Sequence, residues 1–212
     1  MKQPTIIFIS VFTLIAFFSC NAMKQDPNKN NMETTIKTDT AVFATGCFWC
    51  TEAIFSELKG VISVTPGFAG GTTESPTYEQ VCTGTTGHAE CCRIIYAPDT
   101  ITYDKLLEVF WKVHDPTSLN RQGEDVGTQY RSAIFYKSDK QKELAEKYKK
   151  ELNASGAFDK QIVTEIVPLK VFWPSENYHQ NYYNLNKSKP YCQVVIRPKL
   201  EKFEKVFKDA LK

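Results

Sequence analysis

Short apolar runs of strand character alternate with amphipathic stretches of helical spacing along most of this chain. A strand is expected at 40–45, a helix at 48–59 and a second strand at 61–68. An amphipathic element must bury its apolar face against another element. The alternation therefore favours helices packed on a sheet, rather than a helical bundle or an all-β fold.

The alternation continues to the C-terminus. Further strands are expected at 90–96, 130–136 and 162–167, and further helices at 103–114, 139–153, 178–185 and from Leu200 onward. Asp139 is the expected N-cap of the helix at 139–153, and Gly156 is placed to end it. The repeated order strand–helix–strand predicts the α+β class, as a two-layer α/β sandwich with a mixed sheet and a split βαβ (ferredoxin-like) core.

The N-terminus has the pattern of an export signal. A positively charged start precedes an apolar run at 6–18, which is too short for a confident membrane span. A small residue and Cys20 follow, as in bacterial lipoprotein signals, where that cysteine carries the lipid. An ordinary cleaved signal with a chance cysteine is the alternative interpretation.

Three segments follow from these patterns. We expect a lipoprotein-like export signal at 1–20, a flexible polar tether at 21–39 and a single domain at 40–212. The mature protein would be anchored to a membrane through lipid alone and face the periplasm or the cell exterior, or else be soluble in the periplasm. We expect it to be a monomer.

The overall charge excludes one class of partner. The chain of 212 residues has a formal net charge of +2, and its 24% charged and 42% hydrophobic residues are typical of a globular protein. A protein that binds nucleic acid through its phosphates carries a marked positive excess, which is absent here.

The sharpest local feature is the run Gly46-Cys47-Phe48-Trp49-Cys50, where a predicted strand gives way to a helix. Amide groups at a helix N-terminus favour negative charge, so a lowered pKa and a reactive thiolate are expected for Cys47. Gly46 allows a sharp backbone turn. Phe48 and Trp49 could form an apolar wall for a methyl or thioether group, although ordinary core packing explains such rings equally well.

Other candidate groups lie farther along the chain. Glu90 enters a buried strand, where desolvation would raise the pKa of its carboxyl and let it act as an acid near neutral pH. Tyr78 and Tyr130 carry hydroxyls that could donate hydrogen bonds to a polarised oxygen. Taken singly, a solvated Glu and two core tyrosines would be the ordinary interpretation.

Five motifs together resemble the peptide methionine sulfoxide reductase A family, in its order and at its spacings. They are Gly46-Cys47-Phe48-Trp49, Pro76-Thr77-Tyr78-Glu79-Gln80-Val81-Cys82, Gly87-His88-Ala89-Glu90, Phe110-Trp111 with His114-Asp115-Pro116, and Gly127-Thr128-Gln129-Tyr130-Arg131-Ser132. The resemblance spans about 41–197. It implies a peptide-methionine (S)-S-oxide reductase, which returns the S epimer of methionine sulfoxide, in proteins and in free form, to methionine.

The resemblance also implies roles for single residues. Cys47 matches the nucleophile, and Glu90 matches the acid that protonates the sulfoxide oxygen. The remaining matches are Phe48 and Trp49 as the methyl pocket, Tyr78 and Tyr130 as hydroxyls on the oxygen, and Asp125 as a polar residue of the same site. The thiol would become a sulfenic acid and then a disulfide, which an external thioredoxin-like dithiol reduces, with no bound cofactor and no metal.

The thiol that closes the disulfide is left open by the sequence. Cys50 stands three residues after Cys47, the spacing of redox pairs at helix starts, whereas Cys192 matches a Tyr-Cys pair that often has this role in the family. Cys192 is slightly preferred on the resemblance. Cys91 and Cys92 are adjacent on a strand and should point to opposite faces.

Two other functions remain alternatives. A general thiol-disulfide oxidoreductase would also place a Cys-x-x-Cys at a helix start, but it would need neither Glu90 nor the two tyrosines. A lipid-anchored protein that binds zinc through Cys47, Cys50, Cys91 and Cys92 is the non-catalytic alternative, and the adjacent pair makes poor ligand geometry for it.

Overall fold

The computed structural model describes residues 37–212. The predicted signal at 1–20, Cys20 and most of the tether at 21–39 lie outside the described residues. The first strand begins at Asp39, one residue earlier than expected. No helix within the described residues combines the length and the apolar content that crossing a bilayer requires.

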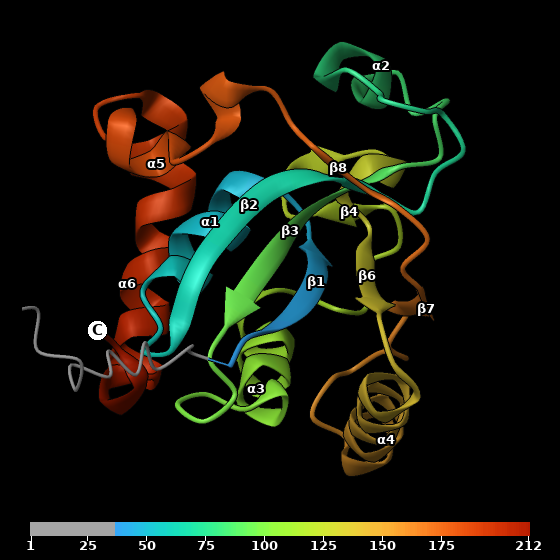
Figure 1. Cartoon of the computed structure of the whole chain (residues 1–212), viewed down its shortest axis with the longest axis vertical. Coiled ribbons are helices and arrows are strands. Elements are labelled where there is room, and N and C mark those ends of the chain that lie inside the picture. Colours follow the sequence, from blue (N-terminus) through green and yellow to red (C-terminus); the bar gives the residue numbers. More distant parts are fainter. Residues whose placement is uncertain (1–36) are drawn as a thin grey trace, which may run out of the picture. The chain divides into compact units, whose positions relative to one another are not determined.

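Six strands form one curled mixed sheet (Figure 1). They are β1 (Asp39–Thr45), β2 (Val61–Ala69), β3 (Ala89–Tyr96), β6 (Ser132–Tyr136), β7 (Glu165–Pro168) and β8 (Phe172–Pro174). Their order is β7-β6-β1-β3-β2-β8, and only β6 and β7 pair in parallel. A separate two-stranded ribbon consists of β4 (Arg121–Gln122) and β5 (Asp125–Val126).

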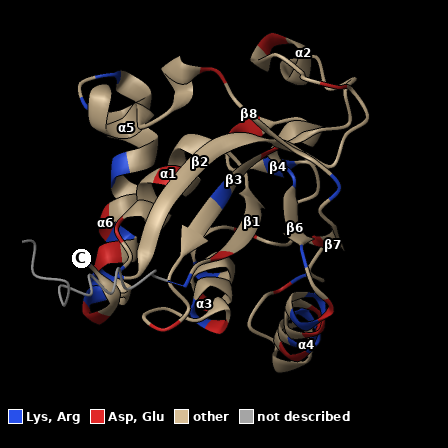
Figure 2. Cartoon of the chain, viewed as in Figure 1, with Lys and Arg blue, Asp and Glu red and all other residues tan. Residues whose placement is uncertain are grey.

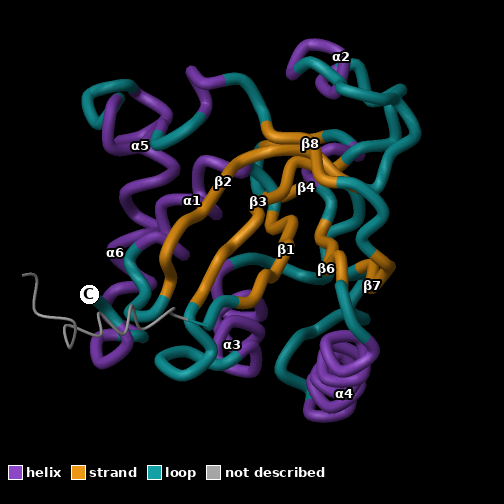
Figure 3. The backbone as a smooth tube through the Cα atoms, viewed as in Figure 1, coloured by secondary structure: helices purple, strands orange, loops and turns teal. Residues whose placement is uncertain are grey.

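The helices connect these strands. Figure 3 shows helices, strands and loops in different colours. The α-helices are α1 (Phe48–Ser56), α2 (Tyr78–Cys82), α3 (Tyr103–Val113), α4 (Asp139–Ser155), α5 (Tyr182–Leu185) and α6 (Arg197–Val206). Short turns of other helix types are η1 (Thr128–Tyr130), η2 (Asn177–His179), η3 (Cys192–Ile196, a π-helix) and η4 (Lys208–Ala210). The mixed α/β architecture agrees with the prediction.

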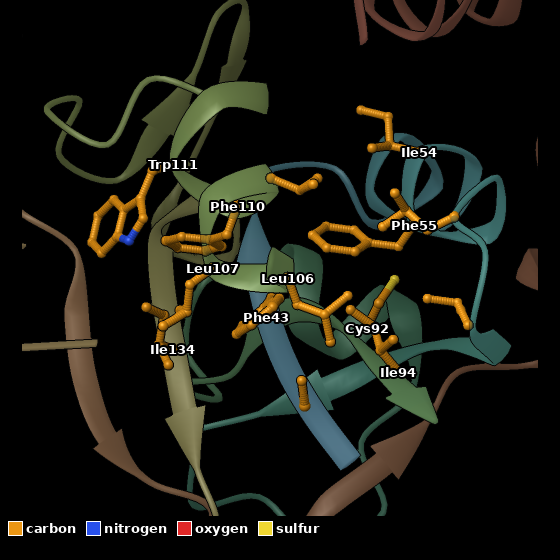
Figure 4. Close-up of a cluster of buried hydrophobic side chains, with 14 of the residues drawn as sticks. Phe43, Ile54, Phe55, Cys92, Ile94, Leu106, Leu107, Phe110, Trp111 and Ile134 are labelled. Atoms are coloured by element: carbon orange, nitrogen blue, oxygen red, sulfur yellow. The ribbon is translucent and has the colours of Figure 1, made fainter. Parts of the chain in front are cut away.

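The main core lies between α1, α3 and one face of the sheet (Figure 4). Alternate side chains of a strand share a face, so Phe43 of β1 lies on the same side as Cys92 and Ile94 of β3. Phe55 of α1 and Phe110 of α3 pack on Phe43, with ring centroids 5.7 and 5.1 Å away. Each such ring, fully buried, contributes roughly 1.5–3 kcal/mol to folding. This packing holds α1 and α3 against the sheet.

A smaller apolar cluster covers the opposite face of the sheet. Cys91 belongs to this cluster, with Val42, Phe135 and Phe172, whereas Cys92 belongs to the main core. The prediction that these adjacent cysteines point to opposite faces is confirmed. Cys47, Cys50, Cys91 and Cys92 therefore do not gather around one point, which removes the geometric basis of the zinc alternative.

The structure corrects several element boundaries. Helix α1 ends at Ser56 rather than at 59, because Leu58 leaves the helix to form a bridge with Leu211. The side chain of Ser138, not Asp139, caps α4 by accepting a hydrogen bond from the backbone of Gln141. Helix α6 begins at Arg197, ahead of the expected Leu200, and α2, β8 and the π-helical turn η3 were not predicted.

Charged side chains of both signs alternate along α4 (Figure 2). Two ion pairs there, Lys142–Glu146 and Lys147–Glu151, have N···O distances of 3.9 Å and are exposed. Exposed pairs of this kind contribute about 0–1 kcal/mol each, so they do not determine how the site is built.

Candidate active site

The site begins at the junction between β1 and α1. Gly46 has a φ of +92°, a conformation that residues with a Cβ rarely adopt. A Cβ there would lie 2.5 Å from the Cβ of Gln122. The amide of Gln122 is itself fixed, because it bonds the backbone N–H and carbonyl of Asp115 at 3.1 and 3.0 Å. Only glycine fits this turn, as the sequence predicted.

Cys47 is the N-cap residue of α1. Its carbonyl accepts hydrogen bonds from the amides of Cys50 and Thr51, at 3.1 and 3.3 Å. The residue is 5% exposed. The sulfur is thus held at a helix N-terminus, close to the surface but largely removed from water.

Glu90 lies on β3, next to the turn between β1 and α1. It faces the same side of the sheet as Cys92, and its Oε2 accepts a hydrogen bond of 3.0 Å from the amide of Phe48. Because Phe48 follows Cys47 in the chain, this bond brings the carboxyl to the turn that carries the sulfur. Burial, followed by the nearby Cys47, raises the pKa of Glu90 well above its ordinary value. Burial therefore favours the uncharged form of this carboxyl, which can donate a proton.

The two predicted tyrosines converge on Glu90. Tyr78 begins α2, after a capping box formed by Thr77 and Gln80, and Tyr130 ends η1. Burial is the main reason that the pKa of each phenol is raised, and the proximity of Glu90 is the second. Both hydroxyls stay protonated and can donate hydrogen bonds to a bound oxygen.

Asp125 reaches the site through Tyr191, a residue that the sequence analysis did not select. The hydroxyl of Tyr191 donates a 2.8 Å hydrogen bond to Oδ2 of Asp125 and also hydrogen bonds with the thiol of Cys47. Its neighbour Cys192 drew attention in the sequence, but nothing in the local pattern marked the tyrosine itself.

Phe48 and Trp49 form part of an aromatic group beside Cys47. Phe48 is buried, and its ring centroid lies 5.1 Å from that of His179 and 6.2 Å from that of Tyr78. Trp49 stacks on Tyr182 with centroids 3.7 Å apart, and its indole Nε1 donates a 3.2 Å hydrogen bond to Nδ1 of His179. The wall that the motif predicted is therefore completed by rings from the C-terminal third of the chain.

Glu52 ties that C-terminal segment to α1. Its two carboxyl oxygens accept hydrogen bonds from the backbone of Asn181 and Tyr182, at 2.7 and 3.2 Å. Burial raises the pKa of this carboxyl to about 7. No local sequence pattern indicates this role, because the partner amides lie about 130 residues away.

The thiol chemistry differs from the expectation in one respect. Cys47 and Cys50 are hydrogen bonded, and burial together with Cys50 raises the pKa of Cys47 well above that of a free thiol. The pKa of Cys50 is lowered instead, first by the hydrogen bond with Cys47 and further by Lys199, which overcome its burial. The prediction of a lowered pKa for Cys47 is wrong in this structure, because burial and Cys50 raise the pKa of Cys47, and the thiolate form is more stable at Cys50 than at Cys47.

Two other cysteines lie around this pair. Cys192 is fully buried in the same apolar cluster as Cys47 and Cys50, whereas Cys82 is exposed on α2. A cavity of about 670 Å³ is lined mainly by α3 and α6, including Trp111, and reaches Lys199. None of Cys47, Glu90, Tyr78 and Tyr130 lines that cavity.

Comparisons with known proteins agree with this arrangement. Residues 39–211 match the family model described as peptide methionine sulfoxide reductase. The chain is 54% identical over 166 residues to peptide methionine sulfoxide reductase MsrA of Nautilia profundicola, which covers 78% of this chain and 94% of the relative. It is 49% identical over 174 residues to the MsrA of Saccharolobus solfataricus, covering 82% of this chain and 97% of the relative.

Solved structures give the same result. Methionine sulfoxide reductase A of Corynebacterium diphtheriae superposes with a TM-score of 0.64 and 40% identity, over 70% of this chain and 75% of that one. Reduced Mxr1 from Saccharomyces cerevisiae superposes with a TM-score of 0.67 and 35% identity, over 74% of this chain and 90% of that one. The chain described here belongs to the peptide methionine sulfoxide reductase A family.

Proposed function

We propose that this protein reduces the S epimer of methionine sulfoxide, in proteins and in free form, to methionine. The observation that carries the proposal is the buried carboxyl of Glu90, bonded to the backbone of α1 immediately after Cys47. A sulfoxide sulfur is a poor electrophile until its oxygen is protonated. A nucleophilic sulfur and an uncharged acid at one corner meet that requirement together.

In this reaction, Cys47 attacks the sulfoxide sulfur while Glu90 delivers a proton to the oxygen. The hydroxyls of Tyr78 and Tyr130 hold the oxygen through hydrogen bonds, which strengthen as charge develops on it. Asp125 orients Tyr191, whose hydroxyl hydrogen bonds with the attacking sulfur. Methionine leaves, and Cys47 remains as a sulfenic acid.

The apolar part of the substrate has a matching surface. Phe48 and Trp49 offer aromatic faces beside the sulfur, and His179 and Tyr182 hold these rings in place. We assign the methyl group of the substrate to this wall. Transfer of a methyl group on sulfur from water to an apolar contact lowers its free energy.

A second thiol then condenses with the sulfenic acid to form a disulfide. We favour Cys50 over Cys192, because Cys50 interacts directly with Cys47 and its pKa is lowered, whereas burial raises the pKa of Cys192. An external dithiol of the thioredoxin kind reduces the disulfide by exchange, and no bound cofactor takes part.

Three further points belong to the proposal. The strand order β6-β1-β3-β2, with α1 and α3 as connections, supports describing the core as a split βαβ or ferredoxin-like unit. We expect this unit to act as a monomer. We also expect export and lipidation at Cys20, which mass spectrometry of the mature N-terminus would test.

The function is tested with the two separated epimers of methionine sulfoxide and a dithiol reductant. We expect turnover of the S epimer, little of the R epimer, and no turnover by Cys47→Ser. Cys91→Ala is the matched control, because that thiol lies in the apolar cluster on the opposite face of the sheet and should leave turnover unchanged. Reduction of protein disulfides without methionine production would instead support the general oxidoreductase alternative.

A further inference from the structure

Lys199 on α6 makes an unusual contact with the thiol pair. Its Nζ lies 3.8 Å from Sγ of Cys50, although 149 residues separate them in the chain. Cys50 is 4% exposed, so little water competes with this contact. Among residues 37–212, no carboxylate lies within 4.0 Å of the ammonium of Lys199. Its charge is therefore available to a negative sulfur.

The groups around Cys50 determine how stable its thiolate form is. Lys199 and the hydrogen bond with Cys47 favour a thiolate at Cys50, whereas burial and the charge of Asp125 oppose it. His114 lies near Lys199, but burial lowers the pKa of its imidazole to about 4, so it is neutral at pH 7. A cation within about 4–6 Å typically lowers the pKa of an acid by about 1–3 units.

We propose that Lys199 is a positioning residue for the thiol pair, keeping Cys50 as the anionic partner of Cys47. Cys50 then accepts the proton of Cys47 as that sulfur attacks, and it later closes the disulfide. This inference rests on the proposed function and adds to it one residue and one proton path.

The proton and electron balance of this path is complete. In the first step, the Cys47 sulfur bonds to the sulfoxide sulfur, its proton passes to Cys50, and the proton of Glu90 goes to the oxygen. Methionine leaves reduced by two electrons, and Cys47 is left oxidised as the sulfenic acid. In the second step, the Cys50 sulfur bonds to the Cys47 sulfur, and the hydroxide that leaves takes the Cys50 proton and becomes water. Solvent then reprotonates Glu90.

Cys192 lacks this support. It is fully buried, and both burial and the proximity of Cys47 raise the pKa of its thiol. A sulfur that is costly to ionise attacks slowly, because the thiolate is the reactive form. The contact of Lys199 with Cys50, which Cys192 is not shown to share, therefore favours Cys50 for the closing step.

The test compares Lys199→Met, which keeps the length and removes the charge, with Lys199→Arg, which keeps the charge. Lys202→Met is the matched control, since Lys202 is an exposed lysine of the same helix. Each reduced enzyme is mixed with one equivalent of the S epimer. Methionine release is timed, disulfide closure is followed by alkylation and mass spectrometry, and thiolate absorbance is titrated against pH.

For Lys199→Met we expect methionine release to persist, while closure at neutral pH slows about tenfold and the thiolate titration moves up by about one pH unit. With the dithiol in steady state, kcat falls while KM for the sulfoxide is not raised. Lys199→Arg should restore most of the rate, and Lys202→Met should match the wild type. Lys199→Gln, with its thermal unfolding measured, serves as a second neutral variant should the Met variant fold poorly.

Two results would overturn the inference while leaving the proposed function intact. One result is that both neutral variants, Lys199→Met and Lys199→Gln, have the same thiolate titration and the same rate of disulfide closure as the wild type. The other is a first disulfide that joins Cys47 to Cys192. Failure of the wild-type enzyme to release methionine would instead overturn the proposed function itself.

Discussion

Two regions meet at the site, and they are built differently. The turn between β1 and α1, with β3 beneath it, is made of regular elements and carries Cys47 and Glu90. The segment from 175 to 199 runs through a 3₁₀ turn, a four-residue helix and a π-helical turn. It contributes the rings, the phenol and the ammonium that surround the sulfur.

The two regions have different roles in the proposed reaction. The groups that make and break bonds lie on regular elements. Such elements can hold the positions of these groups to within a fraction of an ångström. The groups that adjust charge and enclose the substrate come from a long irregular segment, which can vary without disturbing the sheet.

The largest effect is expected at the rigid turn. Gly46→Ala should destabilise the protein by about 3 kcal/mol, combining backbone strain with a clash against Gln122, and should reduce activity by displacing Cys47. Gly156→Ala is the matched control, since it also has a positive φ, of +70°, but no heavy atom lies within 4 Å of a Cβ there. Its loss should be about 1 kcal/mol. Equal losses in denaturant unfolding would contradict the steric account.

A smaller effect is expected where the two regions are joined, at Glu52. The pKa of this carboxyl is raised from 4.5 to about 7 in the folded state, which therefore binds the proton more tightly than the unfolded chain. Its contribution to stability is present below pH 4.5 and is lost as the pH rises through about 7.

Unfolding of the wild type and of Glu52→Gln across this pH range measures that contribution. The wild type should lose stability relative to the variant as pH rises, by an amount on the order of 2 kcal/mol. A difference between the two proteins that is independent of pH would show that Glu52 does not titrate as described.

The smallest effect is expected in the irregular segment, at Tyr191. Tyr191→Phe removes the hydroxyl that links the sulfur of Cys47 to Asp125, so methionine release in a single turnover should slow by about tenfold, with stability little changed. Tyr183→Phe is the control, because its ring lies in the same apolar cluster. Equal rates in the two variants would remove Tyr191 from the chemistry.

The rigid region could be predicted from the sequence. The strand at 40–45, the glycine turn and the helix that starts at Phe48 follow from local patterns, and β3 places Glu90 by simple alternation. The end of α1 could not be predicted, because Leu58 leaves the helix for a tertiary contact with Leu211.

The irregular region could not be predicted in the same way. His179, Tyr191 and Lys199 act through contacts with residues 66 to 149 positions earlier in the chain. No periodicity marks such contacts. For the same reason, the expected ionisation of Cys47 was wrong: a helix N-terminus is visible in the sequence, but a neighbouring Cys50 stabilised by a distant lysine is not.

The central claim is that an uncharged carboxyl at Glu90 protonates the sulfoxide as Cys47 attacks. The most direct test is single-turnover release of methionine from the S epimer, measured against pH in the wild type and in Glu90→Gln. We expect the wild-type rate to fall as the pH rises through the raised pKa of Glu90, and the variant to be slower by about 10²–10⁴-fold without that fall. A variant with the rate and the pH profile of the wild type would contradict the account.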